Sequence, residues 1–216
     1  MQHIYNPDTI WRFHVNPSDY TLYLECKTES NTFYLVEPNT SKRWDFPLLD
    51  RYVCTLMNLQ YPYALLSYFH QDNLMNQSIL MVYNLEQDKE IWSSSELRVE
   101  ECFTDVLKVY PTKISPKRFE YINFHQEKIE NPALLELALD IEHADKNGNL
   151  HSINYNNITY QLLIGDQTVL TIQNGSESET HRYDVDDARI EYDYLLRIGH
   201  KVILMLNKHE LVVFES

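Results

Sequence analysis

Short runs that alternate between apolar and polar residues, separated by polar turns, recur along most of the chain. Extended runs of β-branched, aromatic and leucine residues are expected at 9–15, 20–26, 32–37, 42–46, 52–58, 63–69, 79–84, 90–93, 102–110, 119–125, 158–164, 167–173, 179–185, 193–198, 201–206 and 209–215. Alternation with a period of two places successive side chains on opposite faces of a strand. The pattern therefore predicts an all-β protein made of many short strands.

One segment, residues 131–148, supports two interpretations. Asn131 and Pro132 at its start and Gly148 at its end are typical of a helix. Its apolar residues at 135, 137, 139 and 141 alternate with polar or small ones, however, and Asn147-Gly148 is typical of a hairpin turn. We favour a strand, and whether residues 131–147 form a helix or a strand stays open.

A strand ending is written twice, as "SYFHQD" at 67–72 and "INFHQE" at 122–127. Both runs open after a proline, at Pro62 and Pro116, and a third such run follows Pro17. Proline suits the first residue of a strand. Each copy continues as a strand, a polar turn and a further strand: "TFYLVEPNTSKRWDF", "SILMVYNLEQDKEIWSS" and "LLELALDIEHADKNGNLHSI", with a fourth copy in "YLLRIGHKVILMLNKHELVVFES". The recurrence indicates equivalent strands of successive repeat units.

The three tryptophans follow the same scheme. Trp44 and Trp92 close the first two copies, whereas Trp11 precedes copy one. Trp11 either belongs to the first strand of copy one or completes the last unit by pairing with the C-terminal strands, which closes a ring.

A period of about 45–55 residues with a strand–turn–strand unit ending in an aromatic residue resembles β-propeller repeat proteins of the WD40 or quinoprotein type. The resemblance implies one domain over residues 1–216, a propeller-like ring of about four or five short antiparallel blades. Stacked units bury the apolar faces that a single unit leaves exposed. A double-sheet β-sandwich is the alternative. No functional residue of those families has a matching motif in this chain.

Charge and cysteine content narrow the partners and the compartment. The 216 residues carry a formal net charge of −14, and no dense basic cluster is present, so neither nucleic acid nor an anionic membrane is an expected partner. No apolar run reaches the length of a membrane span, and no signal peptide is recognised. Cys26, Cys54 and Cys102 lie in apolar contexts without CxxC spacing. They are expected to be reduced thiols in a cytoplasmic protein.

The candidate binding residues are His70, His125, Asp186 and Asp187. If the two histidines end equivalent strands, they lie on one rim, where imidazoles bind ligands or exchange protons. The two aspartates belong to the acidic stretch "YDVDDARIEYD" at 183–193, whose oxygens suit a hard cation, although the EF-hand pattern is absent. We assign no metal and no cofactor.

Neither a nucleophile motif nor a phosphate-binding glycine loop occurs. The expected function is therefore a non-catalytic binding protein whose partner is a protein or a carbohydrate. The alternative is a carbohydrate-active enzyme or glycan-binding module that uses rim histidines and acids. Whether the chain is an enzyme stays open.

Overall fold

The structure is a computed structural model that describes residues 1–29, 33–46, 51–70, 78–103, 106–130, 141–165, 167–183 and 195–215, with the backbone alone at 51–54 and 70. The described residues contain 21 strands in five antiparallel sheets and no helix. The all-β prediction is thus confirmed. The chain divides into two compact units: unit 1 comprises Met1–Trp11 and Leu139–Ser216, and unit 2 comprises Arg12–Ala138. Each unit is described by itself, and the prediction of a single domain stays a prediction.

Unit 2 holds three sheets whose strands follow one another in chain order. The first sheet has β2 (Thr9–Val15), which begins in unit 1, then β3 (Leu22–Lys27), β4 (Phe33–Glu37) and β5 (Lys42–Asp45). The second has β6 (Arg51–Gln60), β7 (Tyr63–His70), β8 (Ile79–Asn84) and β9 (Lys89–Ser94). The third has β10 (Leu97–Cys102), β11 (Val106–Pro111) and β12 (Glu120–Asn123).

The three sheets of unit 2 stack in series because the middle sheet is apolar on both faces. Along β7, Ala64 and Leu66 pack into the core shared with the first sheet, whereas Leu65 between them packs into the core shared with the third. This is the period-two alternation of a strand, with both faces covered. Three stacked layers differ from a two-sheet sandwich. The repeat predicted similar sheets that bury each other's faces, and unit 2 has this arrangement.

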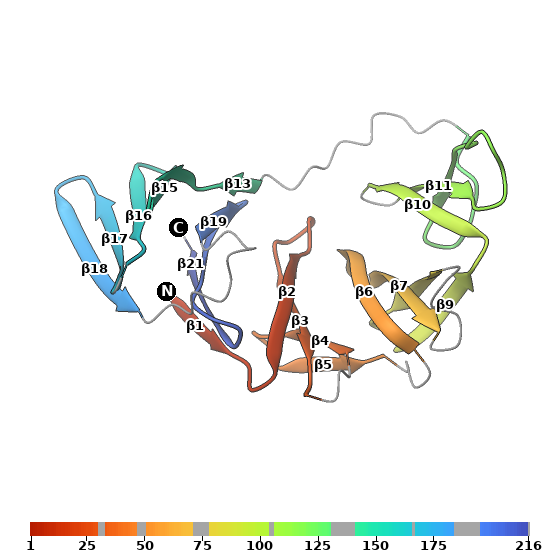
Figure 1. The fold of residues 1–216 in the computed structure, drawn as a ribbon, viewed down its shortest axis with the longest axis horizontal. Helices are drawn as coiled ribbons and strands as arrows, with labels where there is room; N and C mark the ends of the chain where they lie inside the picture. Colours follow the sequence, from red (N-terminus) through yellow and green to blue (C-terminus); the bar gives the residue numbers. More distant parts are fainter. Residues whose placement is uncertain are drawn as a thin grey trace. The chain divides into compact units, whose positions relative to one another are not determined.

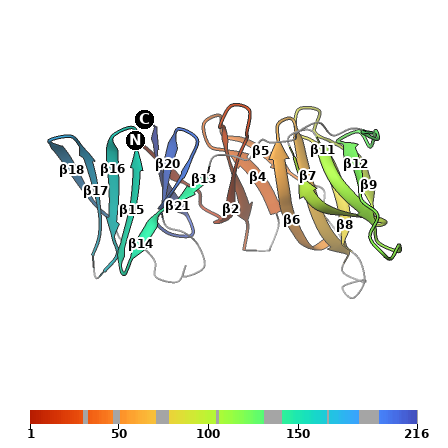
Figure 2. The same ribbon diagram turned by 90° about the horizontal axis from the view of Figure 1, so that it is seen from above.

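Unit 1 holds two sheets. One contains β14 (Asp145–Asn147), β15 (Leu150–Tyr155), β16 (Ile158–Leu163), β17 (Thr168–Asn174) and β18 (Glu177–Tyr183) side by side (Figure 2). The other has the order β1 (Gln2–Tyr5), β21 (Glu210–Glu215), β20 (Lys201–Met205), β19 (Leu195–Ile198) and β13 (Ile141–His143). Leu162, Leu170, Val202 and Val212 lie in the apolar core that these sheets share.

The first and last strands of the chain are neighbours. β1 pairs antiparallel with β21, with Gln2 opposite Val213 and Tyr5 opposite Glu210, so the two termini lie close together (Figure 1). Two places were expected for Trp11: the first strand of copy one, or a pairing with the C-terminal strands that closes a ring. Trp11 belongs to β2, the first strand of the first sheet, so the ring closure through Trp11 is wrong. The short β1, with one buried side chain, gave no hydrophobic pattern to recognise.

The structure shows a repeated hydrogen bond from a tryptophan indole to the carbonyl of the residue that follows an asparagine. Trp44 on β5 donates its indole N–H to the Leu85 carbonyl (2.6 Å), and Trp92 on β9 donates to the Phe124 carbonyl (2.7 Å). Each acceptor follows directly on an asparagine that ends the third strand of the next sheet, Asn84 of β8 and Asn123 of β12. Both tryptophans close their copies, as predicted.

The third copy was assigned wrongly. Because Asn123-Phe124 is equivalent to Asn84-Leu85, β12 corresponds to β8 and not to β7, so the repeated Phe-His-Gln does not mark equivalent strands. In addition, β13 pairs with β19 in unit 1 rather than with β12. The "DKNGN" hairpin is present between β14 and β15, with Gly148 at a φ of 59°. Residues 141–147 are therefore extended, while 131–140 lie outside the described residues.

Every sheet in the described part of the chain is open, with two edge strands, and none closes on itself. The propeller-like ring and its number of blades remain predictions.

Candidate interaction site

His125 lies in the turn after β12, where it contacts the first residue of β7. Its Nε2 is 2.8 Å from the Tyr63 hydroxyl oxygen, and the two rings meet edge to face at 5.4 Å. Tyr63 also stacks on Phe124, with 5.1 Å between ring centroids. The His125 side chain is exposed, so it presents an imidazole at the surface where the second and third sheets meet.

Asn123 holds the turn that carries His125. Its Oδ1 accepts the backbone N–H groups of His125 and Glu127, both at 2.9 Å, and its Nδ2 donates to the Glu127 carboxylate at 2.7 Å. Asparagine side chains stabilise such turns by replacing a backbone partner. Glu127, the acid nearest in the sequence, is therefore bonded to Asn123 and not to His125.

The structure does not bring His70 and His125 together. His125 contacts Tyr63 at the start of β7, whereas His70 is the last residue of that strand. Seven residues at about 3.3 Å each separate those ends by about 23 Å. The shared rim that the sequence analysis expected for these histidines is therefore wrong. The His70 side chain, Asp186 and Asp187 lie outside the described residues, and their binding roles stay predictions.

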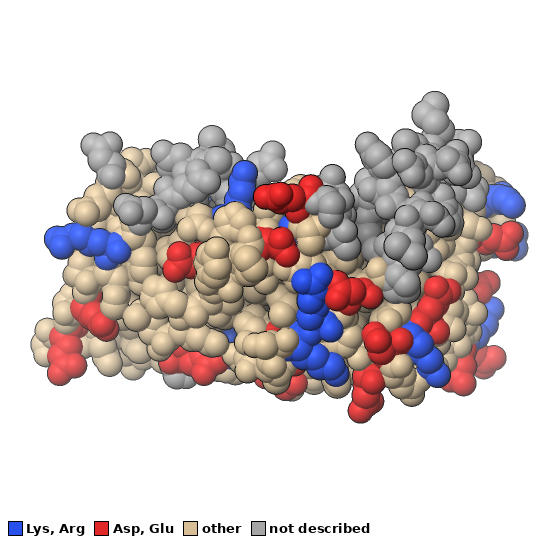
Figure 3. Space-filling model, turned by 90° about the horizontal axis from the view of Figure 1, so that it is seen from below, with Lys and Arg blue, Asp and Glu red and all other residues tan. Residues whose placement is uncertain are grey.

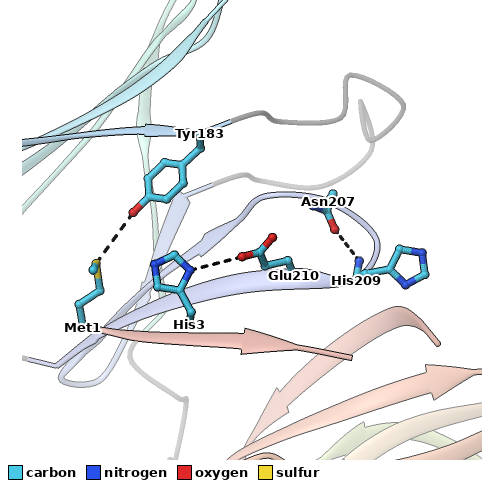
Figure 4. A network of polar contacts seen from close by, with 6 residues as sticks. All are labelled: Met1, His3, Tyr183, Asn207, His209 and Glu210. Atoms are coloured by element: carbon cyan, nitrogen blue, oxygen red, sulfur yellow. Dashed lines mark hydrogen bonds and ion pairs between the residues drawn. The ribbon is translucent and has the colours of Figure 1, made fainter. Parts of the chain in front are cut away.

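A polar cluster that the sequence analysis missed joins β1, β18 and β21 (Figure 4). His3 Nδ1 lies 3.3 Å from Glu210 Oε1, and the Tyr183 hydroxyl donates to Met1 Sδ at 3.9 Å. The rings of His3 and His181 each lie 6.1 Å from that of Tyr183. Burial, then the charges of Glu179 and Glu210, raise the pKa of Tyr183. The residues of this cluster come from three distant segments of the sequence, so no local motif could predict the cluster.

A second missed feature is a buried ion pair in the first sheet. His14 Nε2 lies 3.1 Å from Glu25 Oε2, and the Glu25 side chain is fully buried. The other carboxylate oxygen, Oε1, has no hydrogen-bond partner among the described residues. Glu25 lies opposite Leu35 of β4, on the same face of the first sheet. Leu35 is buried in the core that the first and second sheets share, so Glu25 faces this core. Such a carboxylate depends on the one partner that it has.

The third sheet has one face packed on the second sheet and one face that carries aromatic and charged side chains. Leu107, Val109 and Ile122 point into the core. The opposite face, here called the aromatic face, consists of Phe103, Lys108, Tyr110, Lys117, Phe119 and Tyr121. Phe119 keeps 43% of its surface exposed, and Ile114, in the loop between β11 and β12, keeps 46%.

Lysines lie over the rings of the aromatic face and are held there by acids. Lys117 Nζ is 4.2 Å from the centroid of Tyr110, and Lys108 Nζ is 4.9 Å from that of Phe119. Lys108 donates to Glu101 at 2.8 Å and Lys117 to Glu100 at 3.1 Å. These hydrogen bonds raise the pKa of both lysines, which stay charged. The contacts fix side chains that otherwise have many rotamers.

The described residues hold no group of three or more His, Cys, Asp or Glu side chains arranged to bind a metal ion. Cys26 is buried and Cys102 is half-buried. Burial raises the pKa of Cys102 to about 11, so it is a poor nucleophile. On the face drawn in Figure 3, acidic side chains are interspersed with basic ones and do not form a single field. Neither the side-chain groupings nor the distribution of charge therefore indicates an active site among the described residues.

The fold and these sites define an all-β protein of stacked antiparallel sheets. No family model matches the chain, and no curated protein matches it. Among solved structures it is similar to the WD40 domain of SCAP from fission yeast, with a TM-score of 0.31 and 11% identity over 99% of this chain and 53% of that one. It is also similar to KlHsv2 with loop 6CD replaced by a Gly-Ser linker, with a TM-score of 0.32 and 12% identity over 96% of this chain and 78% of that one.

The chain thus spans about half the length of the SCAP domain. TM-scores this low assign neither a fold family nor a function. Within the described residues, no helix has the length and hydropathy needed to cross a bilayer.

Proposed function

We propose that the chain is a non-catalytic interaction protein with propeller-like stacked sheets, and that it binds a protein partner through the aromatic face. The observation that carries the proposal is the exposure of Phe119, whose ring contacts that of Tyr110, on a face of the third sheet that no described sheet of unit 2 covers. Ile114, in the loop between β11 and β12, is exposed as well. Aromatic side chains with a polar handle supply large contact areas in protein interfaces. The half-buried free thiol of Cys102 suits a reducing compartment, and we propose the cytoplasm.

The geometry of the aromatic face favours binding because its side chains are ordered before a partner arrives. Lys108 and Lys117 are each held between an aromatic ring and a glutamate. Ordering a long side chain on binding costs about 0.5–1.5 kcal/mol. A face whose lysines are already held has less of that cost to meet, and Phe119 keeps 43% of its surface exposed beside Lys108.

The carbohydrate-active alternative has no support from the described residues. It requires a pocket that holds at least two converging titratable groups, with His70 or His125 among them, whereas the His125 side chain is exposed at the surface. His125 contacts Tyr63, and the nearby Glu127 is bonded to Asn123. The geometry at His125 therefore supports a surface contact rather than acid–base catalysis.

The test places a photoreactive phenylalanine analogue at Phe119 in the source cells and compares its crosslinks with those of the same analogue at Tyr5. Tyr5 is the matched control because it is 70% exposed and lies in unit 1. We expect a protein crosslinked at position 119 and not at position 5. The purified partner should bind Phe119→Ser about 30-fold more weakly, the loss typical of a central aromatic contact. Equal crosslinking at both positions, or unchanged affinity for Phe119→Ser, contradicts the proposal.

A further inference from the structure

The sheet β14–β18 has an outer face that carries one acid, Asp145 opposite Ser152 on the edge strand β14, and is almost free of charge on β15–β18. Its side chains lie in rows set by the strand register: Ser152, Gln161, Thr171 and Thr180; Asn154, Thr159, Gln173 and Ser178; and Leu150, Leu163, Val169 and Arg182. We call these twelve residues the neutral face. The residues between them, such as Ile153 and Tyr160, point into the core of unit 1 on the other side. The pattern is therefore a property of one face and not of the whole sheet.

The absence of charge is unusual for this chain. Charged residues make up 23% of the sequence, and the net charge is −14, yet Arg182 is the one charged residue among the twelve. A solvated sheet face in such a protein is expected to carry acids and lysines, which also discourage sheet-to-sheet contact. Leu163, 49% exposed, lies in the middle of the third row. Depletion of charge together with an exposed apolar residue is typical of the centre of an interface.

The neutral face is also regular. The pairings β15–β16, β16–β17 and β17–β18 run without a register shift, whereas β8–β9 and β10–β11 each contain one and β6–β7 contains two. Bulges increase local twist and bend a strand. A sheet without them presents rows of side chains that can meet a second sheet at the spacing of about 10 Å found between packed sheets.

We propose that the neutral face binds the same face of a second copy of this chain, related by a two-fold axis. Hydroxyl and carboxamide side chains both donate and accept hydrogen bonds, so rows of them complement themselves. Two molecules of charge −14 repel each other, and the repulsion is least over β15–β18, where the face carries no acid and Asp145 lies at its edge on β14. The aromatic groups that commonly stack on sugars, such as Tyr155 and Tyr160, lie on the buried side of this sheet, which disfavours a carbohydrate.

The area of the face limits the strength of this association. Four strands spaced by about 4.8 Å, each with about seven residues of about 3.3 Å, cover roughly 20 by 20 Å, or about 400–500 Å² per copy. A standard interface buries about 800 Å² per partner. We therefore expect a weak, reversible dimer with a Kd between about 10 and about 500 µM.

Sedimentation velocity of the full chain, from about 5 to about 500 µM, tests the inference over this range. We expect a concentration-dependent dimer that strengthens as salt rises, because salt screens the repulsion between like-charged copies. Dimers held by opposite charges weaken with salt. Thr171→Lys and Thr171→Glu each place like charges across the two-fold axis, and each should raise the Kd at least about tenfold.

Ser93→Lys, at an exposed position of β9 outside the neutral face, is the matched control and should leave the Kd unchanged. Gln161→Lys, one strand away from Thr171, is a second variant in case Thr171 substitutions unfold the sheet, which circular dichroism reports. A monomer over the whole range overturns the inference, as does a dimer that all three neutral-face variants retain. Monomers that are retarded in a gel containing a neutral polysaccharide overturn it too, because the occupant is then a carbohydrate.

Discussion

The buried pair of His14 and Glu25 gives the sharpest stability prediction. The substitution His14→Ala removes the one hydrogen-bond partner that the described residues provide for the fully buried Glu25 carboxylate. Removing one partner of a buried ion pair typically costs about 3–5 kcal/mol, since the remaining charge stays in the interior without compensation. Small proteins have a total stability of about 5–15 kcal/mol, so this loss is a large share.

The assay is urea unfolding followed by tryptophan fluorescence, because Trp44 and Trp92 both report on unit 2. With an m-value of about 2 kcal/mol/M, His14→Ala should lower the midpoint by about 1.5–2.5 M. Glu25→Leu, which fills a similar volume without charge, should cost less than His14→Ala, because the half-buried His14 can still reach water.

The double variant His14→Ala/Glu25→Leu decides whether the pair is coupled. We expect it to be more stable than His14→Ala alone, with a coupling energy of about 2 kcal/mol or more. If the two single costs simply add, or if His14→Ala costs less than about 1 kcal/mol, Glu25 does not depend on His14 and the reasoning is refuted.

Three further predictions concern links described above. Trp92→Phe should destabilise unit 2 by about 1–3 kcal/mol in the urea assay, because the Phe124 carbonyl loses its indole donor. Asn123→Ala should speed hydrogen exchange at the amides of residues 125 and 127 about tenfold, since both lose their acceptor; unchanged exchange contradicts the turn assignment. The hydrogen bond from Lys201 lowers the pKa of Glu215 below its ordinary value of 4.5, so its contribution is present above that pH and lost as the pH falls through the lowered pKa. Glu215→Gln should therefore flatten the loss of unit 1 stability below about pH 4.5, by a small amount because the side chain is largely exposed.

Local pattern predicted the strands well where one or both faces are buried. The run expected at 9–15 coincides with β2, and 63–69 falls one residue short of β7. Strands with little burial were missed. β1 has one buried residue, and every residue of β10 is half-buried or exposed. A strand with no core-facing stripe leaves no alternation in the sequence, so its existence depends on the neighbour that it pairs with.

Which strands share a sheet was harder to predict because that information is not local. The Phe-His-Gln recurrence suggested that β7 and β12 are equivalent, whereas the indole acceptors of Trp44 and Trp92 show that β12 matches β8. The asparagines at 84 and 123 carried the true signal, since each precedes the acceptor carbonyl. The His3–Glu210 contact spans 207 positions in the sequence, and no spacing rule reaches that far.

The pairing of β1 with β21 also sets an order of events during synthesis. The ribosome makes Gln2 about two hundred residues before its partner Val213, and at about 5–20 residues per second the first strand waits about 10–40 s for the last. Until then β1 has no strand beside it, and the edge of β20 that receives β21 is open to other chains. The three sheets of unit 2 carry no such delay, since each is complete once its own final strand has emerged. Nascent unit 1 is therefore the part of this protein that most needs shielding by chaperones.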